Sequence, residues 1–346
     1  MNILVTGGCG FIGSNLVDFL IKDNKKNNIL IIDDIKRDGA KLNKRWLENL
    51  YGERKNFRIV IKDIKNNNDI KSFFKDQEMI FHIAGQVAVT TSVKDPVMDF
   101  KINAGGTLNI LEAARKSNTN PVILFTSTNK VYGNLNQYQI KLKDKKYDFK
   151  DLTGGVNEST PLDFHSPYGC SKGAADSYMK DYYRIYGLKT ILFRMSCIYG
   201  PRQFGNEDQG WVAHFIISSI LDKALTIFGD GKQVRDILFI DDLVKAMLQA
   251  TDNINKTKGK VYNIGGGPKN VISLLELLEL LEKHLNKKIN VSYEDWRPGD
   301  QKVYYSNIDK AKEDFGWSPI ITKEKGIVKL INWVKQNKIL IKKRIL

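Results

Sequence analysis

Cysteine and histidine are scarce in this 346-residue sequence, which has only three cysteines and four histidines. The cysteines lie far apart and form no Cys-x-x-Cys pair, and the histidines form no His-Glu-x-x-His pattern. These absences argue against a disulfide framework and against a metal site, so we expect no bound metal. An odd number of isolated cysteines fits a reducing compartment, and we expect a cytoplasmic location.

Long hydrophobic runs are also missing, because no stretch of 18 consecutive residues is apolar. We therefore expect no transmembrane helix and no membrane partner. The sequence begins with a predicted core strand, which leaves no room for a cleaved signal peptide.

Arginine is rare relative to lysine, with 11 Arg among the 54 basic residues that give a net charge of +15. The arginines do not cluster, and no nucleic-acid-binding motif accompanies the charge. The excess indicates a lysine-rich solvated surface, and we expect no nucleic-acid partner.

Short apolar runs alternate with helical patterns through the first 200 residues. This alternation predicts an α/β fold of the Rossmann type, a doubly wound parallel sheet with helices on both faces. The predicted strands are 3–6, 29–32, 57–61, 79–83, 122–127 and 190–195, and the predicted helices include 105–116 and 168–186.

The alternation loosens after residue 200, which predicts two domains. Residues 1–200 with 232–254 would form the dinucleotide-binding domain, with one more strand and helix in 232–250. Residues 201–231 and 255–346 would form a smaller C-terminal α/β lobe over the carboxyl ends of the strands, where ligands bind in open α/β sheets. The lysine-rich stretch 135–158 lacks apolar periodicity and is predicted to be a long loop or lid.

Three glycines follow the first predicted strand in a Gly-x-x-Gly-x-x-Gly pattern, Gly7, Gly10 and Gly13. The first two let the backbone approach a pyrophosphate, and the third lets the next helix pack against the strand. That helix begins at Phe11, and its free N–H groups and positive dipole end can hold phosphates. The pattern predicts a dinucleotide site.

Asp33 ends the second predicted strand, 20 residues after Gly13. A carboxylate there can accept hydrogen bonds from both ribose hydroxyls and would repel a 2′-phosphate, so it favours NAD over NADP. Lys36 and Arg37 lie just beyond and leave NADP open.

Tyr168 and Lys172 lie four residues apart near the start of a predicted helix, so their side chains share a face. A lysine ammonium beside a phenol is expected to lower the pKa of the phenol, which can then remove a proton from a substrate hydroxyl. Tyr51 and Lys55 have the same spacing, and we interpret that pair as part of a surface helix.

The hydroxyl-rich end of the 122–127 strand can lie opposite Tyr168. It continues as Thr126-Ser127-Thr128. Thr128 could hydrogen-bond the reacting oxygen, whereas Thr126 could equally cap a turn.

These motifs together resemble the extended short-chain dehydrogenases/reductases that act on nucleotide sugars. The motifs are the glycine pattern after Thr6, Thr128 ahead of Val131-Tyr132-Gly133, Tyr168-x-x-x-Lys172, and Arg235-Asp236-x-x-x-x-Asp241. Within this family the stretches 86–92, 164–176, 196–205 and 207–211 are most similar to the CDP-paratose 2-epimerases.

The resemblance implies a role for each of several residues. Thr128, Tyr168 and Lys172 would carry catalysis, and Thr128 would also contact the substrate. Gln209, Arg235 and Arg297 would bind the substrate, a CDP-sugar. The residues implied to contact NAD are Gly7, Gly10, Phe11, Ile12, Gly13, Asp33, Asp63, Ile64, Ala84, Gln86, Asn103, Tyr168 and Lys172. It also implies a homodimer or homotetramer.

The two substrate arginines suit a diphosphate, because a guanidinium can bind a phosphate through two hydrogen bonds. The alternative is a salt bridge from Arg235 to Asp236, or from Arg297 to Asp300. Trp211 and Tyr199 could stack on a base or sugar, although Tyr199 could equally belong to the core.

Asn129-Lys130 follow Thr128 at the positions where dehydratases of this fold carry an Asp-Glu acid–base pair. The resemblance therefore implies an epimerase that inverts C2 of CDP-paratose through a transient ketone. Two alternatives stay open: a UDP-sugar 4-epimerase of the same fold, and a non-catalytic NAD-binding sensor.

Overall fold

A parallel sheet forms the centre of the computed structural model, which describes residues 1–37, 39–297 and 299–345. Within these residues seven strands pair in the order β12-β8-β5-β4-β1-β2-β3, and every pair is parallel. The strands are β1 (Asn2–Thr6), β2 (Asn28–Asp33), β3 (Phe57–Ile61), β4 (Met79–His82), β5 (Val122–Thr128), β8 (Lys189–Met195) and β12 (Lys260–Ile264).

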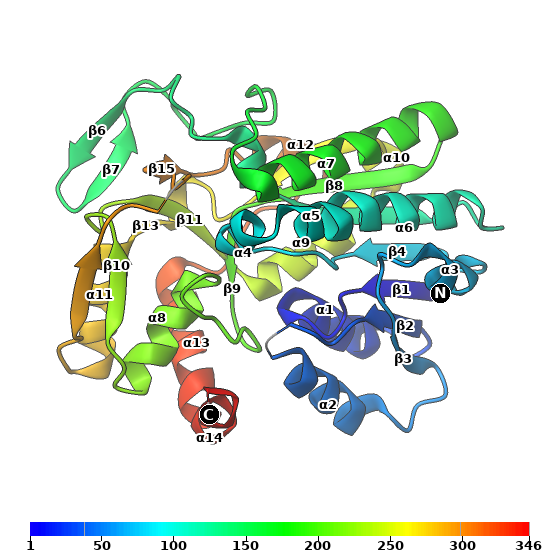
Figure 1. Cartoon of the computed structure of the whole chain (residues 1–346), viewed down its shortest axis with the longest axis horizontal. Coiled ribbons are helices and arrows are strands. Elements are labelled where there is room, and N and C mark those ends of the chain that lie inside the picture. The colour runs from blue at the N-terminus through cyan, green and yellow to red at the C-terminus, as the bar shows by residue number, and fades with distance from the viewer. Residues whose placement is uncertain (38, 298, 346) are drawn as a thin grey trace.

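Alternate side chains of each strand enter two separate cores. Ile3 and Val5 of β1 face one core, whereas Leu4 between them faces the other. The first core includes α1 (Phe11–Asp23), α2 (Ala40–Tyr51) and α9 (Ile240–Asp252); the second includes α6 (Gly106–Arg115) and α7 (Ser166–Tyr186). Helices therefore cover both faces of the sheet, as Figure 1 shows.

Short helical segments lie between the strands of this sheet in the chain or, in the case of α12, contact its strand β12. They are α3 (Asn67–Ile70), η1 (Lys71–Phe74), α4 (Val89–Lys94), α5 (Pro96–Phe100), η2 (Lys101–Gly105), η3 (Asn129–Tyr132), α10 (Ile254–Thr257) and α12 (Asp309–Phe315).

Smaller sheets lie beside the main one, at the left of Figure 1. β11 (Val234–Phe239) pairs with β9 (Cys197–Tyr199), β13 (Val271–Ser273) and β15 (Val303–Tyr304), and β10 (Leu225–Phe228) pairs with β14 (Val291–Glu294). The helical segments of this part are α8 (Trp211–Ile220), η4 (Pro268–Asn270), α11 (Leu274–Leu285), α13 (Lys323–Gln336) and α14 (Lys338–Ile345).

The predicted α/β class and its six predicted strands are confirmed. Two details of the predicted domains are wrong. The predicted strand in 232–250 is β11, which pairs in the smaller sheet, although α9 after it packs against α1. The seventh strand of the main sheet is β12, inside the stretch assigned to the smaller lobe. The division into two lobes itself stays a prediction.

The predicted loop at 135–158 instead contains an antiparallel hairpin, β6 (Ile140–Lys143) and β7 (Lys146–Phe149). Tyr147 of the hairpin donates its hydroxyl to Asp230, and its backbone N–H donates to the Lys232 carbonyl 3.0 Å away. Contacts with distant residues therefore order a segment that has no apolar period.

In the described part of the chain, no helix is both long and apolar enough to span a bilayer.

Candidate active site

The turn from β1 into α1 fits only small residues. Gly7 has φ +72°, and a Cβ there would lie 2.7 Å from the backbone nitrogen of Ala84. A Cβ on Gly13 would lie 2.3 Å from the Gly7 carbonyl oxygen, and one on Gly10 would lie 3.2 Å from it. The glycines therefore let β1, α1 and the end of β4 meet closely, as the motif predicts.

The N-terminus of α1 is open to an anion. Its N-cap residue Gly10 supplies no side-chain cap, and its first turn holds no acidic residue. Phe11, Ile12 and Gly13 form that first turn, so their N–H groups and the positive helix end point away from the helix body. These residues fit the pyrophosphate of a dinucleotide.

Asp33 is buried at the carboxyl end of β2, where its carboxylate accepts N–H groups from Cys9 at 2.9 Å and Ile35 at 2.8 Å. Burial raises the pKa of this carboxyl, although these two hydrogen bonds oppose the rise. Lys36 forms an ion pair with Asp63, with its Nζ 3.2 Å from Asp63 Oδ2, so a carboxylate already balances the charge of its ammonium. Held by the turn beside α1, Asp33 fits the ribose end of NAD.

The other residues implied for NAD lie at the same edge of the sheet. Ala84 donates its N–H to Thr6 Oγ1 at 3.3 Å, and Gln86 donates its N–H to Asn103 Oδ1 at 2.9 Å. Ile64 instead is buried against Gly106 of α6. The edge thus combines an open helix end, a buried carboxylate and amide groups, and these residues fit NAD.

Tyr168 lies in the first turn of α7, and its backbone N–H donates to Ser92 Oγ at 3.1 Å. Its side chain is buried, and its phenol lies close enough to the side chain of Thr128, at the end of β5, for that side chain to lower its pKa. Burial raises the pKa of Tyr168 to about 12; Thr128 lowers it and Asp99 raises it. The predicted pair of hydroxyls is therefore brought together.

Lys172 contacts the backbone and an aromatic ring of β5. Its Nζ donates to the carbonyl oxygen of Thr126 at 2.6 Å and lies 4.2 Å from the centroid of the Phe125 ring. Burial lowers the pKa of Lys172 to about 7, and it is not among the charges that shift the pKa of Tyr168. Burial dominates both groups, and a lowering of the tyrosine pKa by this lysine stays a prediction.

A polar network that the sequence reasoning missed supports α7. Asn103 donates to Ser171 Oγ at 3.0 Å and to Asp99 Oδ1 at 3.2 Å, and Ser171 donates to the other oxygen of Asp99. A Cβ on Gly85 would lie 3.0 Å from Asn103 Oδ1 and 3.8 Å from Lys172 Nζ. The end of β4 is thereby held beside the helix that bears Tyr168. The four-residue spacing of Asp99 and Asn103 is the signal that could have revealed this network.

The substrate arginines occupy different surroundings. Arg235 is buried in β11 and donates to the Val234 carbonyl at 2.7 Å. Arg297 follows β14, with its guanidinium carbon 3.6 Å from the centroid of the Phe228 ring and Nη1 donating to the Glu207 carbonyl at 3.0 Å.

The salt bridges considered as alternatives for these arginines are not formed. The carboxylate of Asp236 instead accepts hydrogen bonds from Ser196 and from the N–H groups of Gly267 and Ser306, both at 3.1 Å. Asp300 lies 3.9 Å from the ammonium of Lys130.

Gln209 and two aromatic residues complete the predicted set. The backbone N–H of Gln209 donates to Asn206 Oδ1 at 3.0 Å. Tyr199 is fully buried in the core, where its ring packs edge-on against Phe239. Trp211 Nε1 lies 3.4 Å from Cys197 Sγ. Of these aromatics, Tyr199 belongs to the core.

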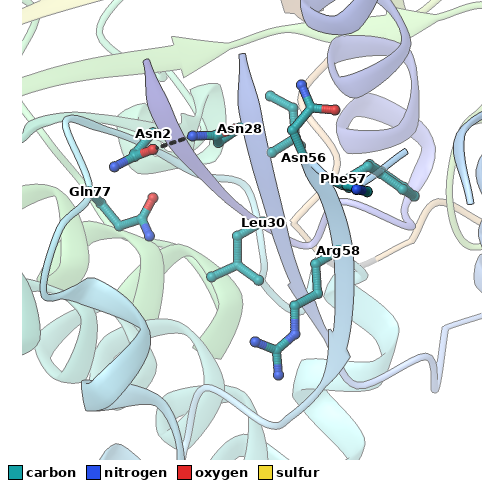
Figure 2. Close-up of a pocket in the computed structure, with 9 residues that line it drawn as sticks. Asn2, Asn28, Leu30, Asn56, Phe57, Arg58 and Gln77 are labelled. Atoms are coloured by element: carbon teal, nitrogen blue, oxygen red, sulfur yellow. Dashed lines mark hydrogen bonds between the residues drawn. The ribbon is translucent and has the colours of Figure 1, made fainter. Parts of the chain in front are cut away.

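The opposite edge of the sheet contains a cavity of about 370 Å3, at the amino ends of β1, β2 and β3 (Figure 2). Asn28 Nδ2 donates to Asn2 Oδ1 at 2.8 Å, and Asn2 Nδ2 donates to the Asp76 carbonyl at 3.0 Å. Of the described residues that line this cavity, none is a predicted site residue. The candidate site thus lies at the carboxyl edge, away from this cavity.

Known proteins resemble the chain over nearly its whole length. The model of the GDP-mannose 4,6 dehydratase family matches residues 4–330. CDP-paratose 2-epimerase from Salmonella typhi is 45% identical over 340 residues, which cover 96% of this chain and 99% of that protein. UDP-glucuronate 4-epimerase from Thermodesulfobacterium geofontis is 32% identical over 341 residues, covering 98% of each.

Solved structures share the fold. UDP-glucuronic acid 4-epimerase from Bacillus cereus, in complex with UDP-glucuronic acid and NAD, has a TM-score of 0.84 at 30% identity and covers 97% of this chain and 99% of that one. The chain belongs to the GDP-mannose 4,6 dehydratase family of short-chain dehydrogenases/reductases, and within it to the NAD-dependent nucleotide-sugar epimerases, which are isomerases.

Proposed function

We propose that this protein interconverts CDP-paratose and CDP-tyvelose by inverting C2 of the sugar. The observation that carries the proposal is that the buried phenol of Tyr168 lies beside the side chain of Thr128, which lowers its pKa, at the carboxyl edge of the sheet. Two adjacent hydroxyls can hold one alcohol of a sugar and transfer its proton. The similarity to a CDP-paratose 2-epimerase from end to end supports the choice of sugar and carbon.

Each catalytic side chain would have one task. Tyr168 would take the proton of the C2 hydroxyl and return it, while Thr128 hydrogen-bonds the same oxygen and holds it in place. Lys172 would fix α7 against β5 through Thr126. NAD bound along the glycine turn would supply the hydride acceptor and a positive ring charge that favours the phenolate, so that the sugar passes through a 2-ketone.

Elimination is disfavoured by the two residues after Thr128. A dehydration needs an acid and a base at the sugar, and the chain offers an amide and an amine there instead. Asn129 Nδ2 donates to Gln301 Oε1 at 3.4 Å, and Lys130 Nζ donates to the Gly299 carbonyl at 3.1 Å. Asn129 thus contacts the side chain of Gln301 and Lys130 the backbone of Gly299, which supports epimerisation over dehydration.

The nucleotide would be held by charge. A nucleotide-sugar diphosphate is an anion, and the guanidinium groups of Arg235 and Arg297 can each make two parallel hydrogen bonds to it. Gln209 lies in the segment that contains Glu207, which already contacts Arg297. We further propose a cytoplasmic homodimer or homotetramer, which light scattering on purified protein would test.

A UDP-sugar 4-epimerase is the second candidate. The similarity of the solved UDP-glucuronic acid 4-epimerase over the whole chain favours it, because the same fold serves C4. Only the pose of the sugar distinguishes the two reactions.

Proton NMR of reaction mixtures separates the candidates. CDP-paratose, UDP-glucose and UDP-glucuronate are incubated separately with the protein, and the configuration at C2 and C4 is followed. We expect CDP-paratose and CDP-tyvelose to reach one equilibrium ratio from either side. Tyr168→Phe should abolish this, whereas Tyr293→Phe at an exposed tyrosine should not. Inversion of a UDP-sugar at C4, with CDP-paratose unchanged, would contradict the proposal.

A further inference from the structure

Lys130 contacts both the catalytic strand and a loop of the substrate side. Its backbone N–H donates to Thr128 Oγ1 at 3.2 Å. Its ammonium donates to the Gly299 carbonyl at 3.1 Å and lies 3.9 Å from Asp300 Oδ1. The side chain is only 20% exposed. One residue therefore joins the reacting threonine to the loop that follows β14.

A second contact docks the same loop. Asn129 Nδ2 donates to Gln301 Oε1 at 3.4 Å, and the amide of Gln301 donates to the Gly133 carbonyl. Gln301 is fully buried. Residues 299–301, called here the docked loop, are thus held against the segment that directly follows β5.

The docked loop lies just after Arg297. The guanidinium of this arginine packs on the Phe228 ring and donates to the Glu207 carbonyl. The position of Arg297 relative to the end of β5 therefore depends on two parts of the chain. One is β10, which contains Phe228, and the other is the docked loop. A change in the docked loop would move the arginine relative to Thr128.

The side chain of Lys130 keeps its positive charge although its surroundings disfavour that charge. Burial and, to a smaller extent, Arg235 lower the pKa of its ammonium to about 8, although Asp300 opposes the shift. A hydrogen bond from a charged donor to a carbonyl is stronger than a neutral one, so the ammonium suits the task of holding a loop. An uncharged side chain of similar length would lack that contact.

We propose that Lys130 is a positioning residue: it holds the docked loop against the end of β5 and so keeps Arg297 where it can bind the diphosphate of the substrate. Lys130 acts through the loop and not on the reacting carbon. The inference rests on the proposed function for its ligand, a nucleoside diphosphate sugar.

Steady-state kinetics with Lys130→Met test the proposal. We expect KM for the nucleotide sugar to rise about tenfold or more, since a charged hydrogen bond is lost, while kcat changes less than about threefold. Lys130→Arg should restore KM to within about threefold of the native value. The matched control is Lys310→Met, because Lys310 is also partly buried and donates to a carbonyl, that of Val261, at 2.9 Å. It should change neither constant.

Calorimetric binding of CDP and of UDP gives a second readout that needs no turnover. Of CDP and UDP, we consider the one that the native protein binds more tightly. Its dissociation constant should rise in Lys130→Met, as KM does. An unchanged constant in a folded variant, or a loss of kcat at constant KM, would overturn the inference. Should Lys130→Met not fold, Asn129→Ala takes its place. We expect this variant to raise the dissociation constant about threefold, and an unchanged constant would overturn the inference. Absence of CDP-paratose turnover by the native protein would instead refute the proposed function alone.

Discussion

Replacing Lys172 by methionine should make the folded protein more stable. This lysine is 5% exposed, and its ammonium contacts one carbonyl and the face of an aromatic ring. Burial lowers its pKa from 10.5 to about 7, although Asp176 and Asp99 oppose the shift. The folded protein therefore holds a charge in a place that disfavours it.

The magnitude follows from that pKa. A decrease from 10.5 to about 7 corresponds to a cost of about 5 kcal/mol in the free energy of unfolding at pH 7 and below. Methionine avoids this cost but leaves the Thr126 carbonyl without its donor, a loss of about 1–3 kcal/mol. We expect Lys172→Met to raise the free energy of unfolding by about 2–4 kcal/mol at pH 6.

The pH dependence gives the sharper test. Between about pH 7 and 10.5 the unfolded chain keeps the lysine proton that the folded protein has lost, so native stability rises with pH. The advantage of the variant should therefore shrink by about 1.4 kcal/mol for each pH unit above 7. Below pH 7 it should stay constant.

Urea unfolding at pH 6, 7, 8 and 9, on protein freed of bound nucleotide, measures both effects. Lys180→Met, at a half-exposed position of α7, is the matched control and should change stability by less than about 0.5 kcal/mol. A variant less stable than the native protein at pH 6, or a difference independent of pH, would refute the reasoning.

Three further substitutions have defined outcomes. Tyr168→Phe should lower kcat by about 100-fold or more with little change in the urea midpoint, since only the proton-transfer hydroxyl is removed. Gly13→Ala should abolish NAD binding in fluorescence titrations, because its Cβ would lie 2.3 Å from the Gly7 carbonyl. Asp176→Asn should lower the free energy of unfolding by about 3–5 kcal/mol in urea titrations, because Arg194, held at 2.8 and 3.1 Å, would stay buried without its partner. Retained turnover, retained NAD affinity or unchanged stability, respectively, would contradict these expectations.

Local patterns in the sequence predicted most of the nucleotide side of the site. The glycine turn depends on residues close together in the chain, and the position of Asp33 follows from the end of one strand. Tyr168 and Thr128 could be paired because strand β5 and helix α7 are both recognisable from their apolar periods. These predictions needed no knowledge of distant contacts.

Predictions that depended on distant contacts did worse. The hairpin within 135–158 is ordered by the hydrogen bond from Tyr147 to Asp230, which lies far along the chain. No apolar period in its sequence predicts it. Strand β12 is short and pairs with β8 across about 70 residues, so its sheet could not be assigned from sequence. The direction of the Lys172 ammonium depends on the Thr126 carbonyl. Lys130 was recognised only as a departure from dehydratases, because its partners lie in a loop about 170 residues away.

The central claim is that inversion proceeds by removal and return of hydrogen at C2 of the sugar, with Tyr168 moving only the hydroxyl proton. Epimerisation of CDP-paratose in deuterium oxide, followed by proton NMR and mass spectrometry, tests it directly. The account predicts that CDP-tyvelose forms with protium at C2. Deuterium at C2 of the product would contradict it, because the carbon-bound hydrogen would then have exchanged with solvent.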